Sequence, residues 1–152
     1  MTADPIRVER IVTNLFSTAH KFTPAGDSIT VDIYSDEDSR FIRISDTGDG
    51  VPSEEHELVF SPYYRSANAD GRQHGGTGFD LIIARYLAEL YGGSLDLTGE
   101  LGEGSVFTLR PPISAGIPQH AGAYRRERVF SHWPVDSRLT RWLLFRRMRR
   151  SL

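Results

Sequence analysis

The chain of 152 residues contains no cysteine, which excludes disulfide bonds and thiolate metal sites and fits a reducing compartment. It also lacks a run of about 18 apolar residues that could cross a bilayer. Its first residues, Met1 to Pro5, have neither the basic nor the apolar region of a signal peptide. The histidines include no pair at metal-ligand spacing. These absences predict a soluble protein located in the cytoplasm.

Lysine is almost absent as well, since the chain has 17 arginines and one lysine, Lys21. The net charge of −2 hides an uneven distribution, because residues 1–112 have a formal charge of −9 and residues 113–152 one of +7. Proline and glycine are concentrated at residues 111–118, as in a linker. We therefore predict a domain over residues 1–112, followed by a linker and an arginine-rich tail over residues 113–152.

Hydrophobic periodicity predicts an α+β fold for the first region. Helices are expected at residues 5–22, where apolar side chains recur at helical spacing, and at 79–90. Alternating segments at residues 29–34 and 41–45 predict one hairpin, and a second hairpin is expected with strands at residues 94–98 and 106–110. This order predicts a two-layer sandwich with helices on one face of a mixed, mainly antiparallel sheet.

A glycine-rich turn, Gly75 to Gly78, leads directly into the second predicted helix. The first N–H groups of a helix are unpaired and lie at the positive end of its dipole, so such a turn predicts an anion site. Phosphate is the expected occupant. On the first helix, Asn14, Thr18 and Lys21 are spaced to project together. The combination indicates a nucleotide site.

A second glycine motif follows the strand predicted at residues 41–45. Asp46 ends this strand and is followed by Gly48 and Gly50. A strand end is a common place for ligand-binding groups. An ionised carboxylate offers only hydrogen-bond acceptors, and glycines let the backbone approach a ligand closely.

The order and spacing of four motifs resemble the N, G1, F and G2 boxes of sensor histidine kinases. The matching segments are Asn14 to Pro24, Asp46 to Gly50, Phe60 to Arg65 and Gly75 to Gly78. The likeness continues through Tyr91-Gly92-Gly93, Gly102 to Phe107 and Pro111, so it spans nearly all of residues 3–112. It implies the ATP-binding catalytic domain of these kinases, with a Bergerat-type α/β sandwich.

The resemblance also implies roles for individual residues. Asp46 would accept a hydrogen bond from the adenine amino group, Lys21 would contact phosphate oxygens, and Tyr64 would lie near the base. The implied ATP-binding residues are Asn14, Lys21, Asp46, Gly48, Gly50, Tyr64, Gly76, Thr77, Gly78 and Phe79. No catalytic general base is assigned.

Two residues depart from the family pattern. Thr18 stands where these kinases usually have an asparagine that holds Mg²⁺, and Asp80 replaces a glycine of the G2 box. We expect Asn14, Thr18 and Asp80 to hold Mg²⁺. The hydroxyl of Thr18 is set back from the metal and should weaken the site. Asp80 either supplies the missing oxygen ligand or repels the phosphates, and the sequence leaves both alternatives open.

Three functions follow from these observations. The favoured one is a histidine kinase module that phosphorylates a histidine on a separate partner and acts through a response regulator, because the chain shows no phosphoacceptor domain. The alternatives are a degenerate module that binds nucleotide or a partner without phosphotransfer, and a related ATPase such as an anti-sigma serine kinase. The family's first strands also have no match here, so we expect an exposed sheet edge that a partner or the tail covers.

The tail itself, residues 113–152, leaves its role open. Arginines are interspersed there with Trp133, Trp142 and Phe145, a composition that suggests contact with a membrane surface or with nucleic acid. On a helical wheel, however, basic and apolar residues segregate poorly. An extension that binds nothing specific is the alternative.

Overall fold

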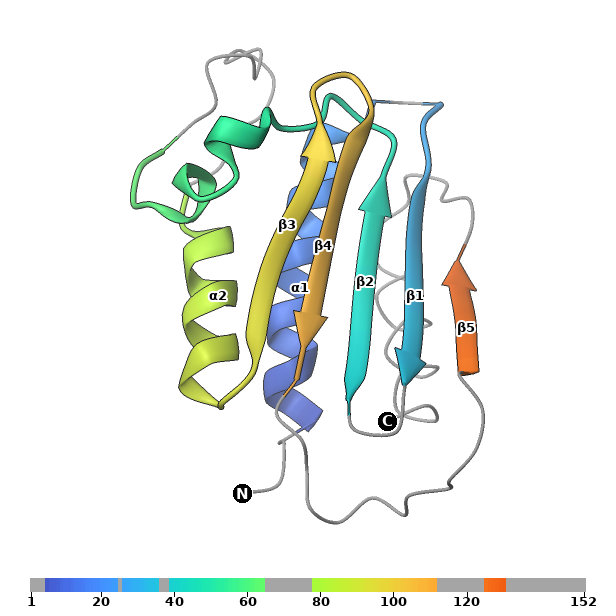
Figure 1. The fold of residues 1–152 in the computed structure, drawn as a ribbon, viewed down its shortest axis with the longest axis vertical. Coiled ribbons are helices and arrows are strands. Elements are labelled where there is room, and N and C mark those ends of the chain that lie inside the picture. The colour runs from blue at the N-terminus through green and yellow to red at the C-terminus, as the bar shows by residue number, and fades with distance from the viewer. Residues whose placement is uncertain (1–4, 25, 36–38, 65–77, 112–124, 131–152) are drawn as a thin grey trace.

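The computed structural model describes residues 5–24, 26–35, 39–64, 78–111 and 125–130. They form two α-helices, two short 3-10 helices and a five-stranded sheet (Figure 1). The elements are α1 (Pro5–Phe22), β1 (Ile29–Ser35), β2 (Arg40–Asp46), η1 (Ser53–Glu55), η2 (Leu58–Phe60), α2 (Asp80–Leu90), β3 (Ser94–Glu100), β4 (Gly104–Arg110) and β5 (Arg125–Phe130). Helices layered against one open sheet confirm the predicted fold class.

The strands lie in the order β3-β4-β2-β1-β5, and every pairing among the described strands is antiparallel. The first hairpin pairs Val31 with Ile44, and β2 continues the row by pairing Ile44 with Phe107 of β4. Because side chains alternate along a strand, such rows place apolar residues on one face of the sheet. That face carries the core.

The core lies between this face and the helices. α1 contributes Leu15 and Val12, which are fully buried, and α2 contributes Ala84, which is also fully buried. α1 lies behind β3 and β4, roughly along the strands, and α2 lies beside α1 and next to β3 (Figure 1). The remaining core residues are Val8, Ile11, Ala19, Ile29, Val31, Ile33, Ile42, Ile44, Phe60, Ala88, Leu95, Leu97, Phe107 and Leu109.

The edge of the sheet at β1 is covered by β5, a strand from the predicted tail. β5 pairs antiparallel with β1, with a register irregularity between Val31 and Asp32. In the sheet, β5 lies three strand spacings from β4, or about 14 Å. The 14 residues between the end of β4 and the start of β5 are long enough to span this distance. The expectation that the tail covers an exposed edge agrees with this pairing. No helix among the described residues is long and apolar enough to cross a membrane.

Candidate functional site

One end of the molecule gathers the segments that the sequence motifs singled out. The end of α1, the end of β2 and the turn between β3 and β4 lie there, at the top of Figure 1, and α2 begins below them. Contacts connect them through the last residues of α1. The Phe22 carbonyl accepts a hydrogen bond from the Asp49 N–H, at 3.4 Å, while Lys21 contacts Asp80 at the start of α2.

Asp46, the last residue of β2, is a buried carboxylate with only 5% of its surface exposed. Its Oδ1 accepts a hydrogen bond from the Gly48 N–H at 3.0 Å. Burial raises the pKa of Asp46 from 3.8 to about 6, although backbone hydrogen bonds from Gly48 and Ser105 oppose the rise. Near pH 7 this residue is therefore an ionised acceptor in a poorly solvated place, which suits it to binding a ligand N–H donor.

Glycines allow the loop after β2 to pack closely against its neighbours. A Cβ atom on Gly48 would lie 2.1 Å from the Phe22 carbonyl oxygen, and one on Gly50 would lie 2.0 Å from that of Glu100. At Gly104, where φ is +89°, it would lie 2.0 Å from the Asp46 carbonyl oxygen. Any side chain at these positions would push apart the backbone around Asp46.

Lys21 and Asp80 form an ion pair that joins the two helices. Lys21 Nζ lies 2.6 Å from Asp80 Oδ2, and the two side chains are 29% and 33% exposed. The chain positions are 59 residues apart, so only the packing of α1 against α2 brings them together. The sequence placed both residues near phosphate, but their direct contact was not foreseen.

The three residues expected to hold Mg²⁺ differ in how well they fit that role. The Thr18 hydroxyl donates a hydrogen bond to the Asn14 carbonyl oxygen at 3.0 Å, and Thr18 is buried. Asp80 is engaged by Lys21. Asn14 is partly exposed in the same row of α1, so its amide oxygen suits a hard cation that also binds phosphate. These contacts engage the Thr18 hydroxyl proton and one oxygen of Asp80, and the assignment of the three residues to Mg²⁺ stays a prediction.

The segment around η2 is fixed to α2 by Arg85. Its guanidinium lies 2.7 Å from a carboxylate oxygen of Glu57 and 4.6 Å from the ring centroid of Phe60. Phe60 in turn is buried in the core. The contacts hold the start of the F-box segment in place against the helix that follows the glycine-rich turn.

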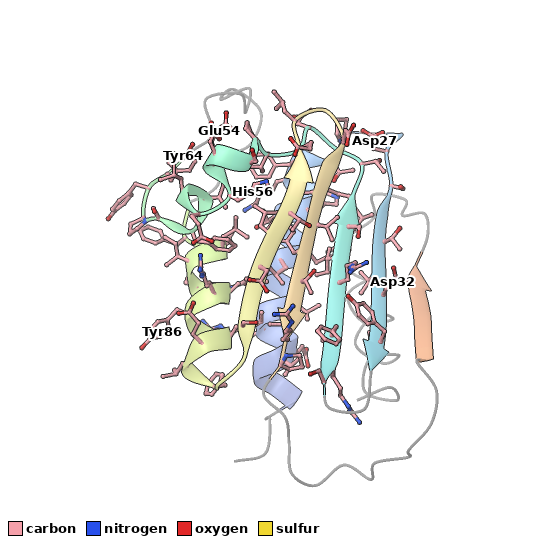
Figure 2. All side chains as sticks on the ribbon, in the orientation of Figure 1. Asp27, Asp32, Glu54, His56, Tyr64 and Tyr86 are labelled. Atoms are coloured by element: carbon pink, nitrogen blue, oxygen red, sulfur yellow. The ribbon has the colours of Figure 1, made fainter. Side chains whose placement is uncertain are left out.

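The aromatic residues after η2 approach the start of α2. The rings of Tyr63 and Phe79 meet edge to face, with centroids 5.0 Å apart. Tyr63 has a φ of 62°, which is unusual for a residue other than glycine, and Gly78 has a φ of +74°. Removal from water and a hydrogen bond with Glu55 raise the pKa of Tyr64, which lies above α2 with Glu54 (Figure 2).

Residues 65–77, between the segment after η2 and the start of α2, are not among the described residues. The predicted site residues Gly76 and Thr77 therefore lie outside the described part of the chain. Most described candidates form two groups: Asp46, Gly48 and Gly50 at the end of β2, and Lys21, Gly78, Phe79 and Asp80 around the start of α2. Asn14 and Thr18 lie further back on α1, and Tyr64 follows η2. Sequence reasoning missed the N–H of Ser105 as a partner of Asp46. The glycine at position 104, directly before it, was the available signal.

Residues 3–115 match the family of histidine kinase-, DNA gyrase B- and HSP90-like ATPases. The circadian input-output histidine kinase CikA of Synechococcus elongatus is 36% identical over 110 residues, covering 72% of this chain and 15% of its own length. The sensor histidine kinase RcsC of Escherichia coli is 36% identical over 123 residues, covering 80% of this chain and 13% of its own length. This chain thus spans a small part of these relatives.

Solved structures show the same similarity. A mycobacterial sensor histidine kinase, MprB, matches with a TM-score of 0.59 and 28% identity, over 68% of each chain. Full-length ShkA, solved in complex with AMPPNP, matches with a TM-score of 0.61 and 26% identity, over 74% of this chain and 23% of its own.

Proposed function

Because this chain belongs to the family of histidine kinase-, DNA gyrase B- and HSP90-like ATPases, we propose that it is the ATP-binding catalytic part of a sensor histidine kinase. It would transfer the γ-phosphate of ATP to a histidine on a partner protein. The observation that supports this most directly is the buried Asp46 carboxylate, which shares one end of the fold with Lys21 and the start of α2. We propose a cytoplasmic location, where ATP and a response regulator would be present.

Each end of the site would bind a different part of the nucleotide. The ionised Asp46 carboxylate would accept a hydrogen bond from the exocyclic amine of adenine, beside the closely packed backbone at Gly48 and Gly50. Lys21 and the start of α2 would lie beside the phosphates. Mg²⁺, held by Asn14 together with the phosphates, would offset their negative charge.

The chemistry would depend on positioning rather than on a base within this chain. The imidazole nitrogen of the partner histidine would attack the γ-phosphorus, and the bond to the β–γ bridging oxygen would break, leaving ADP. Catalysis would follow from alignment of these atoms and neutralisation of phosphate charge.

We propose that the partner binds an exposed apolar side of α2. Ile83, Tyr86 and Leu90 lie at spacings of three and four residues, so they share one side of the helix, and their exposures are 37%, 62% and 55%. Tyr86 points away from α1 and the sheet (Figure 2). Adjacent large apolar side chains on a surface commonly mark a binding site. A helical partner that carries the histidine would dock here, next to the phosphate end of the site.

Calorimetric titration with adenosine and ADP tests nucleotide binding, and labelled ATP with a phosphoacceptor domain tests transfer. Asp46→Ala should abolish the binding of both compounds. Asp96→Asn, an acidic residue on β3 whose side chain is 52% exposed, should leave binding unchanged. Tyr86→Ser should reduce transfer to the partner without changing ADP affinity. If wild-type protein bound neither compound, the proposal would be wrong.

A second candidate is a degenerate module that binds nucleotide or partner without phosphotransfer. Two contacts of residues expected near Mg²⁺ and phosphate favour this alternative. The Thr18 hydroxyl donates a hydrogen bond to the Asn14 carbonyl oxygen, and Lys21 forms an ion pair with Asp80. Nucleotide binding without detectable transfer to any phosphoacceptor domain would support this alternative.

A further inference from the structure

We propose that Asp80 competes with nucleotide phosphate for Lys21 and so lowers the affinity of this site according to the number of phosphates. The inference rests on the proposed function, because Lys21 must face the phosphates for the competition to occur. It assigns a specificity-determining role to a residue that departs from the family pattern.

The geometry shows an ion pair that is already formed. The distance of 2.6 Å between Lys21 Nζ and Asp80 Oδ2 is that of a direct, charge-assisted hydrogen bond. Both side chains are about two-thirds buried, so water screens the pair less than it would a surface pair. The positive charge of Lys21 is therefore largely neutralised before any phosphate arrives.

Asp80 also occupies the other feature that would attract an anion, the start of α2. It is the first residue of this helix, and its carboxylate is favoured there by the helix dipole. Phe79, which precedes it at the N-cap position, provides no side-chain hydrogen bond to the helix. One carboxylate thus satisfies the lysine and the helix dipole, both of which would otherwise be available to phosphate.

A bound polyphosphate must therefore separate Asp80 from Lys21 and then lie near a like charge. The penalty should increase from adenosine, which has no phosphate, through ADP to ATP. Replacing the carboxylate of Asp80 by an amide should increase ATP affinity by about three- to tenfold, increase ADP affinity less, and leave adenosine affinity unchanged.

A double-mutant cycle on the full chain tests the competition. Adenosine, ADP and ATP are titrated into wild type, Asp80→Asn, Lys21→Ala and the double variant, with and without Mg²⁺. In the wild-type background Lys21→Ala should lower ATP affinity, because it leaves the Asp80 carboxylate uncompensated beside the phosphates. The double variant should bind ATP within about twofold of wild type, because neither has a net charge at this place. In the Asp80→Asn background Lys21→Ala should lower ATP affinity by about tenfold.

Two further variants complete the test. Glu89→Gln makes the same acid-to-amide change near the other end of α2, where Glu89 pairs with Arg85 at 3.1 Å, and it should not alter ATP affinity. Asp80→Ser, which keeps a small polar residue at the helix start, should reproduce the gain of Asp80→Asn. These variants separate a local effect on Lys21 from a general change in charge.

Three results would overturn the proposal, and the third would also refute the proposed function. If Asp80→Asn and Asp80→Ser leave ATP affinity unaltered, Asp80 does not compete. If they lower it only when Mg²⁺ is present, the carboxylate is a metal ligand instead. Should adenosine and ADP fail to bind every variant, the proposed function itself would be refuted, and this inference with it.

Discussion

Lowering the pH from 7 to 5 should stabilise the folded domain through Asp46. Burial raises the pKa of this carboxyl from 3.8 to about 6, so the folded protein takes up a proton there more readily than the unfolded chain. The stabilisation is complete below pH 3.8 and is lost as the pH rises through 6. The difference in pKa corresponds to about 3 kcal/mol in total, of which about 1 kcal/mol appears between pH 7 and pH 5.

Urea unfolding of wild type and Asp46→Asn at pH 7, 6 and 5 measures this contribution. The amide does not titrate, so the difference between the two proteins isolates Asp46 from other groups. The free energy of unfolding of wild type should rise by about 1 kcal/mol relative to the variant, or about 4–8 °C in Tm. A difference that stays constant or falls as the pH is lowered would refute the reasoning.

Protonation of Asp46 should also weaken the binding of adenine. If only ionised Asp46 accepts the adenine amine, about one tenth of the protein is competent at pH 5, so adenosine affinity should fall about tenfold from its value at pH 7. Adenosine is the suitable ligand because it has no phosphate that titrates. An adenosine affinity that is equal at both pH values would mean that Asp46 is not the acceptor.

Three other predictions concern the scaffold around the site. Gly48→Ala would place a Cβ 2.1 Å from the Phe22 carbonyl oxygen and should destabilise the domain by about 1–3 kcal/mol in urea. Gly102→Ala, whose Cβ would meet nothing within 4 Å but whose φ is +84°, measures the cost of backbone strain without a close contact. Deleting residues 113–152 should expose the edge of β1, seen as a lower Tm and as self-association in light scattering, whereas an unchanged Tm would argue against the β1–β5 pairing. Arg85→Gln removes the ion pair with Glu57 and the contact with Phe60, and should lower the free energy of unfolding by about 1 kcal/mol; Arg110→Gln is the matched control.

The two α-helices and the strands β1 to β4 were predictable because each has a local signal. α1 spans Pro5–Phe22, as its apolar spacing predicted, and α2 begins one residue after the predicted start. Among the strands, β3 and β4 extend two residues further into the connecting turn than alternation alone indicated. Gly99 and Gly104, with positive φ, allow this tight approach, and their effect on pairing is not visible in a hydrophobic pattern.

β5 was not predicted as a strand, because its local sequence resembles a charged tail. Residues 125–130 read Arg-Arg-Glu-Arg-Val-Phe, without the alternation of apolar and polar residues that marks β1. β5 pairs with the backbone of β1, and an edge strand offers N–H and C=O groups to an extended chain whatever its side chains. A division into domain and tail based on charge alone cannot show such pairing; that division itself remains a prediction.

Within the site, the sequence indicated which residues matter but not how they interact. Lys21 and Asp80 both belong to motifs, yet nothing in a motif tells whether two side chains 59 residues apart bind a ligand or each other. Likewise, Thr18 follows Asn14 by one helical turn, which allows its hydroxyl to bond back to the helix backbone. Such local competition for a polar group depends on rotamers that only the folded structure fixes.

The charged groups at the two ends of the site differ in stability: the charge on Asp46 is disfavoured by its surroundings, and the charge on Lys21 is favoured by them. Asp46 is ionised in a buried place that disfavours the charge, so a ligand donor would offset a penalty already present in the folded protein. Lys21, in contrast, is already stabilised by Asp80, so a ligand anion would have to replace a favourable contact. Under the proposed function, the fold would therefore favour base recognition and oppose phosphate recognition, so substitutions at Asp80 should change nucleotide affinity through the phosphates alone.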